Sequence, residues 1–240
     1  MINYGIKETF SDLNVNESIG AAFNVNSENS NIFVTAKLFQ IVNAITSELS
    51  IFYYQRESNN QTRVSSDEMF PSFLRLELYR SFFKEQGENP IFLTDYDGKV
   101  LVFTHAANYF YINEEKGLKI EYQNNQFKYY TSLDSYFVYS EGKHYPSSFY
   151  IDGVEQYSIT LNSDNKISSI TFKNNVKATF SYSNGYVNGI SVSQRLNINS
   201  NYDEIEYIQF VYSNFNKIIE IKTKQNQSGT VIGRHLKLDF

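Results

Sequence analysis

The chain repeats one pattern three times between Tyr157 and Thr223, as LNSDNKISSI at residues 161–170, YSNGYVNGI at 182–190 and YSNFNKIIEI at 212–221. Each copy has a large apolar or aromatic residue, then a polar turn, then apolar residues again. This order is typical of a β-hairpin, in which two extended segments are joined by a tight turn. The second copy contains Asn184-Gly185, a pair that favours the primed turns whose twist matches the flanking strands. We therefore expect consecutive β-hairpins here.

The residues beyond Pro90 have the same character. Ile91–Thr94 and Lys99–Phe103 are mostly apolar and flank the turn-forming Asp95–Gly98, which predicts another hairpin. Further along, short apolar or aromatic runs alternate with Asn, Asp, Gly or Ser, and no helical stripe interrupts them. We expect residues 91–240 to form a long antiparallel β-meander, as an open sheet, a sandwich or a barrel.

Residues 1–90 are expected to form a mixed α/β region that contains helices. One apolar stripe has the spacing of an amphipathic helix. Its members are Leu38, Ile41, Val42, Ile45 and Leu49. The β-branched residues in the stripe leave a strand as the alternative. The next segment, Ser50–Glu57, is predicted to be a strand.

A second helix is predicted from Pro71 to Gly87. Residues 66–87 contain no Val, Ile or Thr and are rich in Leu, Arg, Glu and Lys, which are good helix formers. A strand is again the alternative, because Leu74, Leu76 and Leu78 alternate with charged residues. The predicted fold class is therefore α+β and predominantly β, with a helix-containing N-terminal portion at 1–90 and an antiparallel β-rich region at 91–240.

Composition narrows the class of protein. A hydrophobic content of 41% with 20% charged residues is that of a globular chain, and a net charge of −5 gives no reason to expect nucleic-acid binding. The absence of cysteine excludes disulfides, thiolate metal sites and cysteine catalysis. The first residues lack the features of a secretory signal, and no apolar run is long enough to cross a bilayer. We expect a cytoplasmic or virion-associated protein without a membrane span.

The chain contains 20 Tyr and 20 Phe, and these residues crowd between Phe127 and Tyr150. On strands, Tyr129, Phe137 and Tyr139 would face inward and their neighbours outward. Outward tyrosines stack on sugar rings or fill pockets of a partner protein. The alternative is a tyrosine-rich core with ordinary exposed tyrosines. The candidate binding residues are Tyr129, Tyr130, Tyr136, Tyr145 and Tyr150.

The segment around Phe180–Ile190 resembles the YD repeats of Rhs-type proteins. The resemblance covers residues 157–223. It implies β-hairpins that wind into a spiralled sheet, as in surface, toxin-delivery and carbohydrate-contacting proteins. This chain departs from the family at the aligned Tyr-Asp pairs, where Leu161-Asn162, Tyr182-Ser183 and Tyr212-Ser213 stand instead.

Glu220-Ile221-Lys222, with Asp203 upstream, looks like the core of PD-(D/E)xK nucleases. That resemblance implies a divalent metal on Asp203 and Glu220, and an attacking water positioned by Lys222. The period of two along a strand places Glu220 and Lys222 on one face. The alternative is a half-exposed strand, in which charged residues alternate with isoleucine in the same way. Asp203 follows Tyr202 instead of the family's proline.

No other catalytic motif is present. None of His105, His144 and His235 has a partner at metal-ligand spacing, so we expect no metal ion and no other cofactor. The predicted function is that of a non-enzymatic structural or interaction protein. Its expected partners are other protein subunits in a larger assembly, such as a phage virion or tail or an injection apparatus. The alternatives are a glycan-binding β-module and a metal-dependent nuclease.

Overall fold

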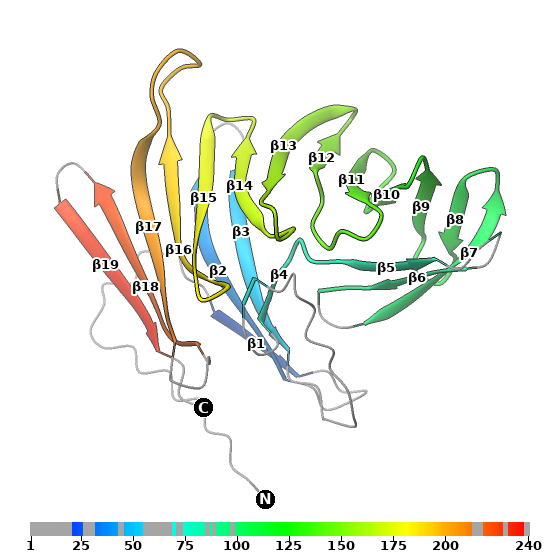
Figure 1. Ribbon diagram of the computed structural model, residues 1–240, viewed down its shortest axis with the longest axis horizontal. Coiled ribbons are helices and arrows are strands. Elements are labelled where there is room, and N and C mark those ends of the chain that lie inside the picture. Colours follow the sequence, from blue (N-terminus) through cyan, green and yellow to red (C-terminus); the bar gives the residue numbers. More distant parts are fainter. Residues whose placement is uncertain are drawn as a thin grey trace, which may run out of the picture.

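A computed structural model shows two antiparallel β-sheets (Figure 1). The residues that it describes are 21–25, 32–42, 46–54, 69–70, 74–84, 87, 90–96, 99–212, 218–227 and 230–237. Each strand pairs with the next strand of its sheet in sequence order. The antiparallel meander predicted beyond Pro90 is therefore confirmed. None of the described residues belongs to a helix long and apolar enough to cross a membrane.

The smaller sheet has four strands in the order of the chain. They are β1 (Ala21–Val25), β2 (Ile32–Val42), β3 (Thr46–Tyr54) and β4 (Leu74–Leu76). The larger sheet has fifteen strands, again in the order of the chain. They are β5 (Ser81–Lys84), β6 (Ile91–Thr94), β7 (Val100–Ala107), β8 (Phe110–Asn113), β9 (Leu118–Gln123), β10 (Gln126–Tyr130), β11 (Ser135–Ser140), β12 (Ser148–Ile151), β13 (Val154–Leu161), β14 (Ile167–Phe172), β15 (Val176–Ser183), β16 (Tyr186–Gln194), β17 (Asp203–Tyr212), β18 (Ile218–Gln227) and β19 (Thr230–Lys237).

Among the described turns of the long sheet, three hairpins turn on two residues that both have positive φ. These pairs are Asn124-Asn125, Asp152-Gly153 and Asn184-Gly185. Positive φ at both central positions is the requirement of a type I′ turn, and Asn, Asp and Gly adopt it at the lowest cost. The primed turn predicted at Asn184-Gly185 is confirmed, with Ser183 opposite Tyr186. The hairpin of β6 and β7 is confirmed as well. The turn of the third repeat, at 213–217, lies outside the described residues.

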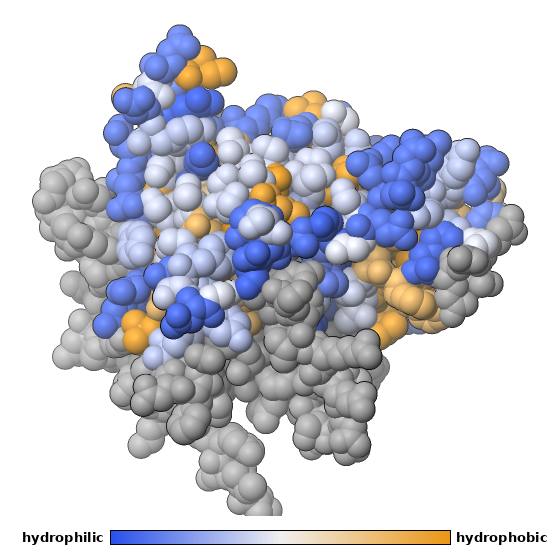
Figure 2. Space-filling view, viewed as in Figure 1, coloured by the Kyte–Doolittle hydropathy of each residue, from blue (hydrophilic) through white to orange (hydrophobic). Residues whose placement is uncertain are grey.

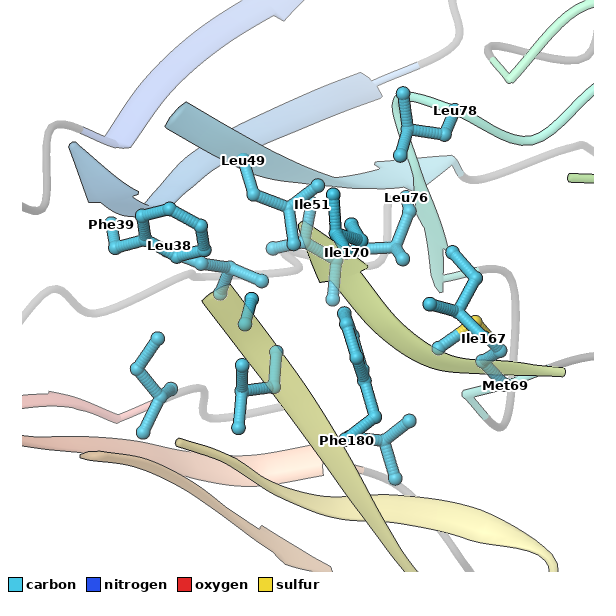
Figure 3. Close-up of a cluster of buried hydrophobic side chains, with 14 of the residues drawn as sticks. Leu38, Phe39, Leu49, Ile51, Met69, Leu76, Leu78, Ile167, Ile170 and Phe180 are labelled. Carbon is cyan, nitrogen blue, oxygen red and sulfur yellow. The ribbon is translucent and has the colours of Figure 1, made fainter. Parts of the chain in front are cut away.

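The main core lies between the two sheets. Side chains from β2 and β3 meet those from β14 and β15, with Leu49 and Ile51 on one side and Ile170 and Phe180 on the other (Figure 3). A second core lies where the long sheet curls, so that β5 and β6 run beneath β8–β12 (Figure 1). There the ring of Phe82 stacks on that of Phe127 from β10, with centroids 4.5 Å apart.

The helix predicted over Leu38–Leu49 is wrong, because the described part of this segment belongs to β2 and β3. Pairing between β2 and β3 shifts register between Lys37 and Phe39, as at a β-bulge. Leu38 and Phe39 are consequently both buried, at 1% and 0% exposed. A bulge interrupts the period of two, so the apolar spacing imitates that of a helix.

The strand alternative is confirmed for the described part of Leu38–Leu49. Ile45, one member of the predicted stripe, lies outside the described residues, between the two strands. The strand predicted from Ser50 is present through Tyr54, and residues 55–57 lie outside the described part of the chain.

The helix predicted over Pro71–Gly87 is also wrong where the structure describes it. Leu74–Leu76 is β4 and Ser81–Lys84 is β5, while the residues after β4 form a turn. Leu76 and Leu78 are buried, in line with the alternation that favoured a strand. Tertiary contacts therefore override the helix propensity of this segment. Residues 71–73 and 85–86 lie outside the described ones. The part of the chain that the structure describes is all β, not α+β.

Candidate functional site

The sheet separates the five candidate tyrosines by face. Tyr129 and Tyr145 are only 4% and 2% exposed and belong to the two cores. Tyr130, Tyr136 and Tyr150 lie on the outer face, directly opposite one another on β10, β11 and β12. We call these three residues the tyrosine row. Period-two alternation places Tyr129 and Tyr130 on opposite faces, because neighbouring residues of a strand point to opposite faces, whereas Tyr145 lies in the loop between β11 and β12.

The tyrosine row is a continuous aromatic strip. The ring centroids of Tyr130 and Tyr136 lie 5.2 Å apart, and those of Tyr136 and Tyr150 lie 5.0 Å apart with planes at 14°. Charged groups flank both ends. Lys119 Nζ lies 3.9 Å from the centroid of Tyr130, and the Tyr150 hydroxyl donates to Glu155 Oε2 at 3.2 Å. The strip thus combines the apolar carbons of three packed rings with donors and acceptors at its ends.

Glu121 holds the Tyr130 end of the row in place. Its Oε2 accepts a hydrogen bond from the Tyr130 hydroxyl at 3.1 Å, and Lys128 Nζ lies 3.3 Å from its Oε1. Burial and the bond to Glu121 raise the pKa of the Tyr130 phenol to about 12. The hydroxyl therefore keeps its proton near neutral pH and remains a hydrogen-bond donor.

A hollow of about 500 Å³ adjoins the tyrosine row at Tyr130. Its lining includes the polar residues Asn113, Glu114 and Ser132, and also Leu133, which is 92% exposed. Polar side chains beside an aromatic strip are the two components that a sugar site needs. One supplies hydrogen bonds to hydroxyl groups, and the other supplies a flat apolar surface.

The structure does not bring the three nuclease candidates together. Lys222 pairs with Gln209 and Glu220 with Val211, whereas Asp203 pairs with Gln194 at the far end of β17. Asp203 and Val211 are eight residues apart on one strand, which corresponds to about 27 Å. The described residues contain no cluster of three His, Asp or Glu side chains that could hold a metal ion.

A second pocket, of about 460 Å³, lies on the inner face and was missed by sequence reasoning. It lies between residues 77–80 and strands β11–β14, and Arg80 and Tyr157 line it. Alternation on β11 predicts that Phe137 faces inward, and Phe137 does line this pocket. No sequence signal marks Arg80, because its partners Asp95 and Tyr129 come from other strands and loops.

No family model matches this chain, and no curated protein matches it.

Proposed function

We propose that this protein is a non-enzymatic binding module that recognises a glycan through the tyrosine row. The observation that carries the proposal is the stacked row of Tyr130, Tyr136 and Tyr150 on the outer face. Sugar rings present flat C–H faces that pack on aromatic rings, and their hydroxyl groups bond to charged side chains nearby. The resemblance of residues 157–223 to repeats of carbohydrate-contacting proteins supports the same interpretation.

The rigidity of the row favours binding. Cross-strand pairing fixes the three rings, and hydrogen bonds from Tyr130 to Glu121 and from Tyr150 to Glu155 fix two hydroxyls. A preformed surface loses little conformational entropy when a ligand binds. The row spans three strands, or about 10 Å, which is the length of two sugar rings.

A glycan array with Tyr136→Ala tests the proposal. Tyr136 is the central ring, so its loss interrupts the strip, and we expect binding to weaken at least about tenfold. The matched control is Tyr202→Ala, which removes a tyrosine in the loop before β17, outside the row. Circular dichroism checks that both variants fold. An array without hits, or equal binding by Tyr136→Ala and the wild type, would contradict the proposal.

An exposed apolar surface on β5–β7 supports a second function. Phe83, Phe92 and Val102 lie opposite one another on the outer face of β5–β7, and Phe83 and Val102 are 58% and 42% exposed. Val100, 56% exposed, extends this apolar row. Figure 2 shows hydrophobic side chains gathered over these strands. Exposed apolar patches of this kind mark contacts between proteins.

We propose that this apolar row joins copies of the chain within a larger assembly, such as a phage virion or tail or an injection apparatus. β5, which carries Phe83 of the row, is the edge strand of the long sheet. A second copy offers the same edge and the same patch, which is what a two-fold contact requires.

Sedimentation velocity at rising protein concentration tests the assembly. The wild type is expected to self-associate, and the double variant Phe83→Ser with Val102→Thr is expected to sediment as a monomer. Val154→Thr, which changes an exposed valine elsewhere, serves as the control. A wild type that stays monomeric, or a double variant that associates equally, would rule out this contact.

A further inference from the structure

The inner pocket has an aromatic floor. Phe137, Phe149, Tyr157 and Phe172 come from the consecutive strands β11, β12, β13 and β14. Their ring centroids are separated by 4.5, 5.3 and 5.5 Å along this row. Leu49 and Leu78 close the opposite side, as parts of the core in Figure 3. The C–H groups of a ring-shaped ligand can therefore contact a continuous aromatic surface on this side of the pocket.

Arg80 is the first of two pocket-lining residues that can donate a hydrogen bond to a ligand. Its side chain is buried, at 6% exposed, and its Nη1 donates to the carbonyl oxygens of Glu77 and Tyr79. Its Nε lies 2.8 Å from Asp95 Oδ1 as an ion pair, without hydrogen-bond geometry. The buried guanidinium places a fixed positive charge in the pocket wall, which favours an acceptor that enters the pocket.

The Tyr157 hydroxyl is the second donor. It makes no hydrogen bond to the described part of the chain, although its ring packs between those of Phe149 and Phe172. Burial raises the pKa of this phenol well above its ordinary value, so the hydroxyl stays protonated and able to donate. A hydroxyl at the wall of a pocket is satisfied when a ligand supplies the acceptor.

The charges of the pocket balance. Arg80 and Lys173 are positive, while Asp95, which pairs with Arg80, and Glu77 are negative. Glu77 Oε1 accepts a hydrogen bond from the backbone N–H of Ser50 at 3.1 Å. A charged ligand would meet a like charge on one side, so the balance favours an uncharged ligand. The amides of Gln156 and Asn174 also line the pocket and suit hydroxyl groups, because an amide both donates and accepts.

We infer that the inner pocket binds an uncharged hexose ring, with its C–H groups against the aromatic floor and its oxygens toward Arg80 and Tyr157. The volume of about 460 Å³ lies within the range of small-ligand pockets. This site is on the opposite face of the sheet from the tyrosine row, so the two sites are independent.

Ligand-observed saturation-transfer NMR with methyl glucoside, methyl galactoside and methyl mannoside tests the inference. At least one of the three is expected to bind the wild type. Tyr157→Phe removes only the hydroxyl, and we expect it to weaken binding of that sugar about fivefold, as for one lost hydrogen bond. Tyr202→Phe, the same change in a loop, is expected to bind as the wild type does. Absence of binding by all three sugars, or unchanged binding by Tyr157→Phe, would overturn the inference.

Three further comparisons test the charge of the ligand, its chemical class and the location of its site. Glucuronate and glucosamine carry the same ring with a negative and a positive charge, and both are expected to bind less tightly than methyl glucoside. Equal or tighter binding of either charged sugar would contradict the argument from charge. Benzamide is an uncharged aromatic ligand that tests the chemical class. If it binds more tightly than all three sugars, the assignment to a sugar is wrong. Tyr136→Ala separates the two sites, because it is expected to leave binding of the free hexose unchanged. If Tyr136→Ala abolishes that binding and Tyr157→Phe does not, the hexose site is the tyrosine row and the inference for the pocket is wrong.

Discussion

At the scale of single residues, the pairing of Tyr130 with Glu121 has the clearest chemical consequence. The phenol is partly buried and donates its proton to a carboxylate, so ionisation would place two negative charges side by side. This is why the pKa of Tyr130 is raised to about 12 from an ordinary value of 10.0. The folded state therefore favours the protonated phenol more strongly than the unfolded chain does.

Ultraviolet titration of tyrosine ionisation should show a group titrating near pH 12 that Tyr130→Phe removes. Because the pKa is raised on folding, this stabilisation is fully present below about pH 10 and is lost as the pH rises toward 12. The difference in unfolding free energy between the wild type and Tyr130→Phe should shrink across this window, as measured by urea denaturation at each pH. A difference that is constant or grows with pH would show that the bond to Glu121 is absent in solution.

At the scale of secondary-structure elements, β16 depends on a glycine inside the strand. Gly189 lies opposite Ser181 of β15 and Gln209 of β17. A Cβ at this position would overlap the Tyr207 hydroxyl oxygen and would lie 2.8 Å from Ser181 Oγ. The tyrosine side chain from the neighbouring strand thus occupies the space that any other residue at 189 would need. A glycine that weakens the strand in isolation is required here by packing.

Gly189→Ala should lower the unfolding free energy by about 1–3 kcal/mol, because the added methyl group forces the Tyr207 side chain aside. In a Tyr207→Ser background the same change should cost less, because only the close contact with Ser181 Oγ remains to be relieved. Chemical denaturation of the four proteins in this double-mutant cycle measures the coupling. Equal effects of Gly189→Ala in both backgrounds would show that Tyr207 is not the obstacle.

At the scale of the whole molecule, the segment Leu78–Arg80 connects the two cores. Leu78 and Tyr79 belong to the core between the sheets. The Leu78 carbonyl accepts a hydrogen bond from the buried Tyr139 hydroxyl of the second core at 3.0 Å, and the Arg80 N–H donates to the His144 carbonyl at 2.8 Å. Buried bonds of this kind couple the packing on both sides. The two cores should therefore unfold together.

Phe39→Ala and Phe103→Ala remove fully buried rings from the first and second core, respectively. Each should lower the unfolding free energy by about 3–5 kcal/mol. Urea denaturation can be monitored both by circular dichroism and by tyrosine fluorescence. The two signals should give one coincident transition for the wild type and for both variants. Two separate transitions, with each variant shifting only one of them, would contradict the coupling through Leu78–Arg80.

The positions of the candidate tyrosines were predictable in part. The sequence singled out five tyrosines, and the structure brings Tyr130, Tyr136 and Tyr150 together while it buries Tyr129 and Tyr145. Alternation along a strand indicates which residues share a face. Tyr145, in the loop after β11, follows no such alternation, so its burial depends on Tyr79, whose ring packs edge-on against it. The inner pocket was not predictable, because Arg80 and Tyr157 are far apart in the chain.

The sequence by itself determined the meander beyond Pro90 and the turn at Asn184-Gly185, because both depend on local chemistry. Short apolar runs favour extended strands, and positive φ selects asparagine and glycine. Tertiary structure alone decided that the described part of Leu38–Leu49 forms strands, that the smaller sheet covers β14 and β15, and that Arg80 and Tyr157 line one pocket. These outcomes depend on contacts between distant segments, whose energies outweigh local propensities of roughly a fraction of a kcal/mol per residue.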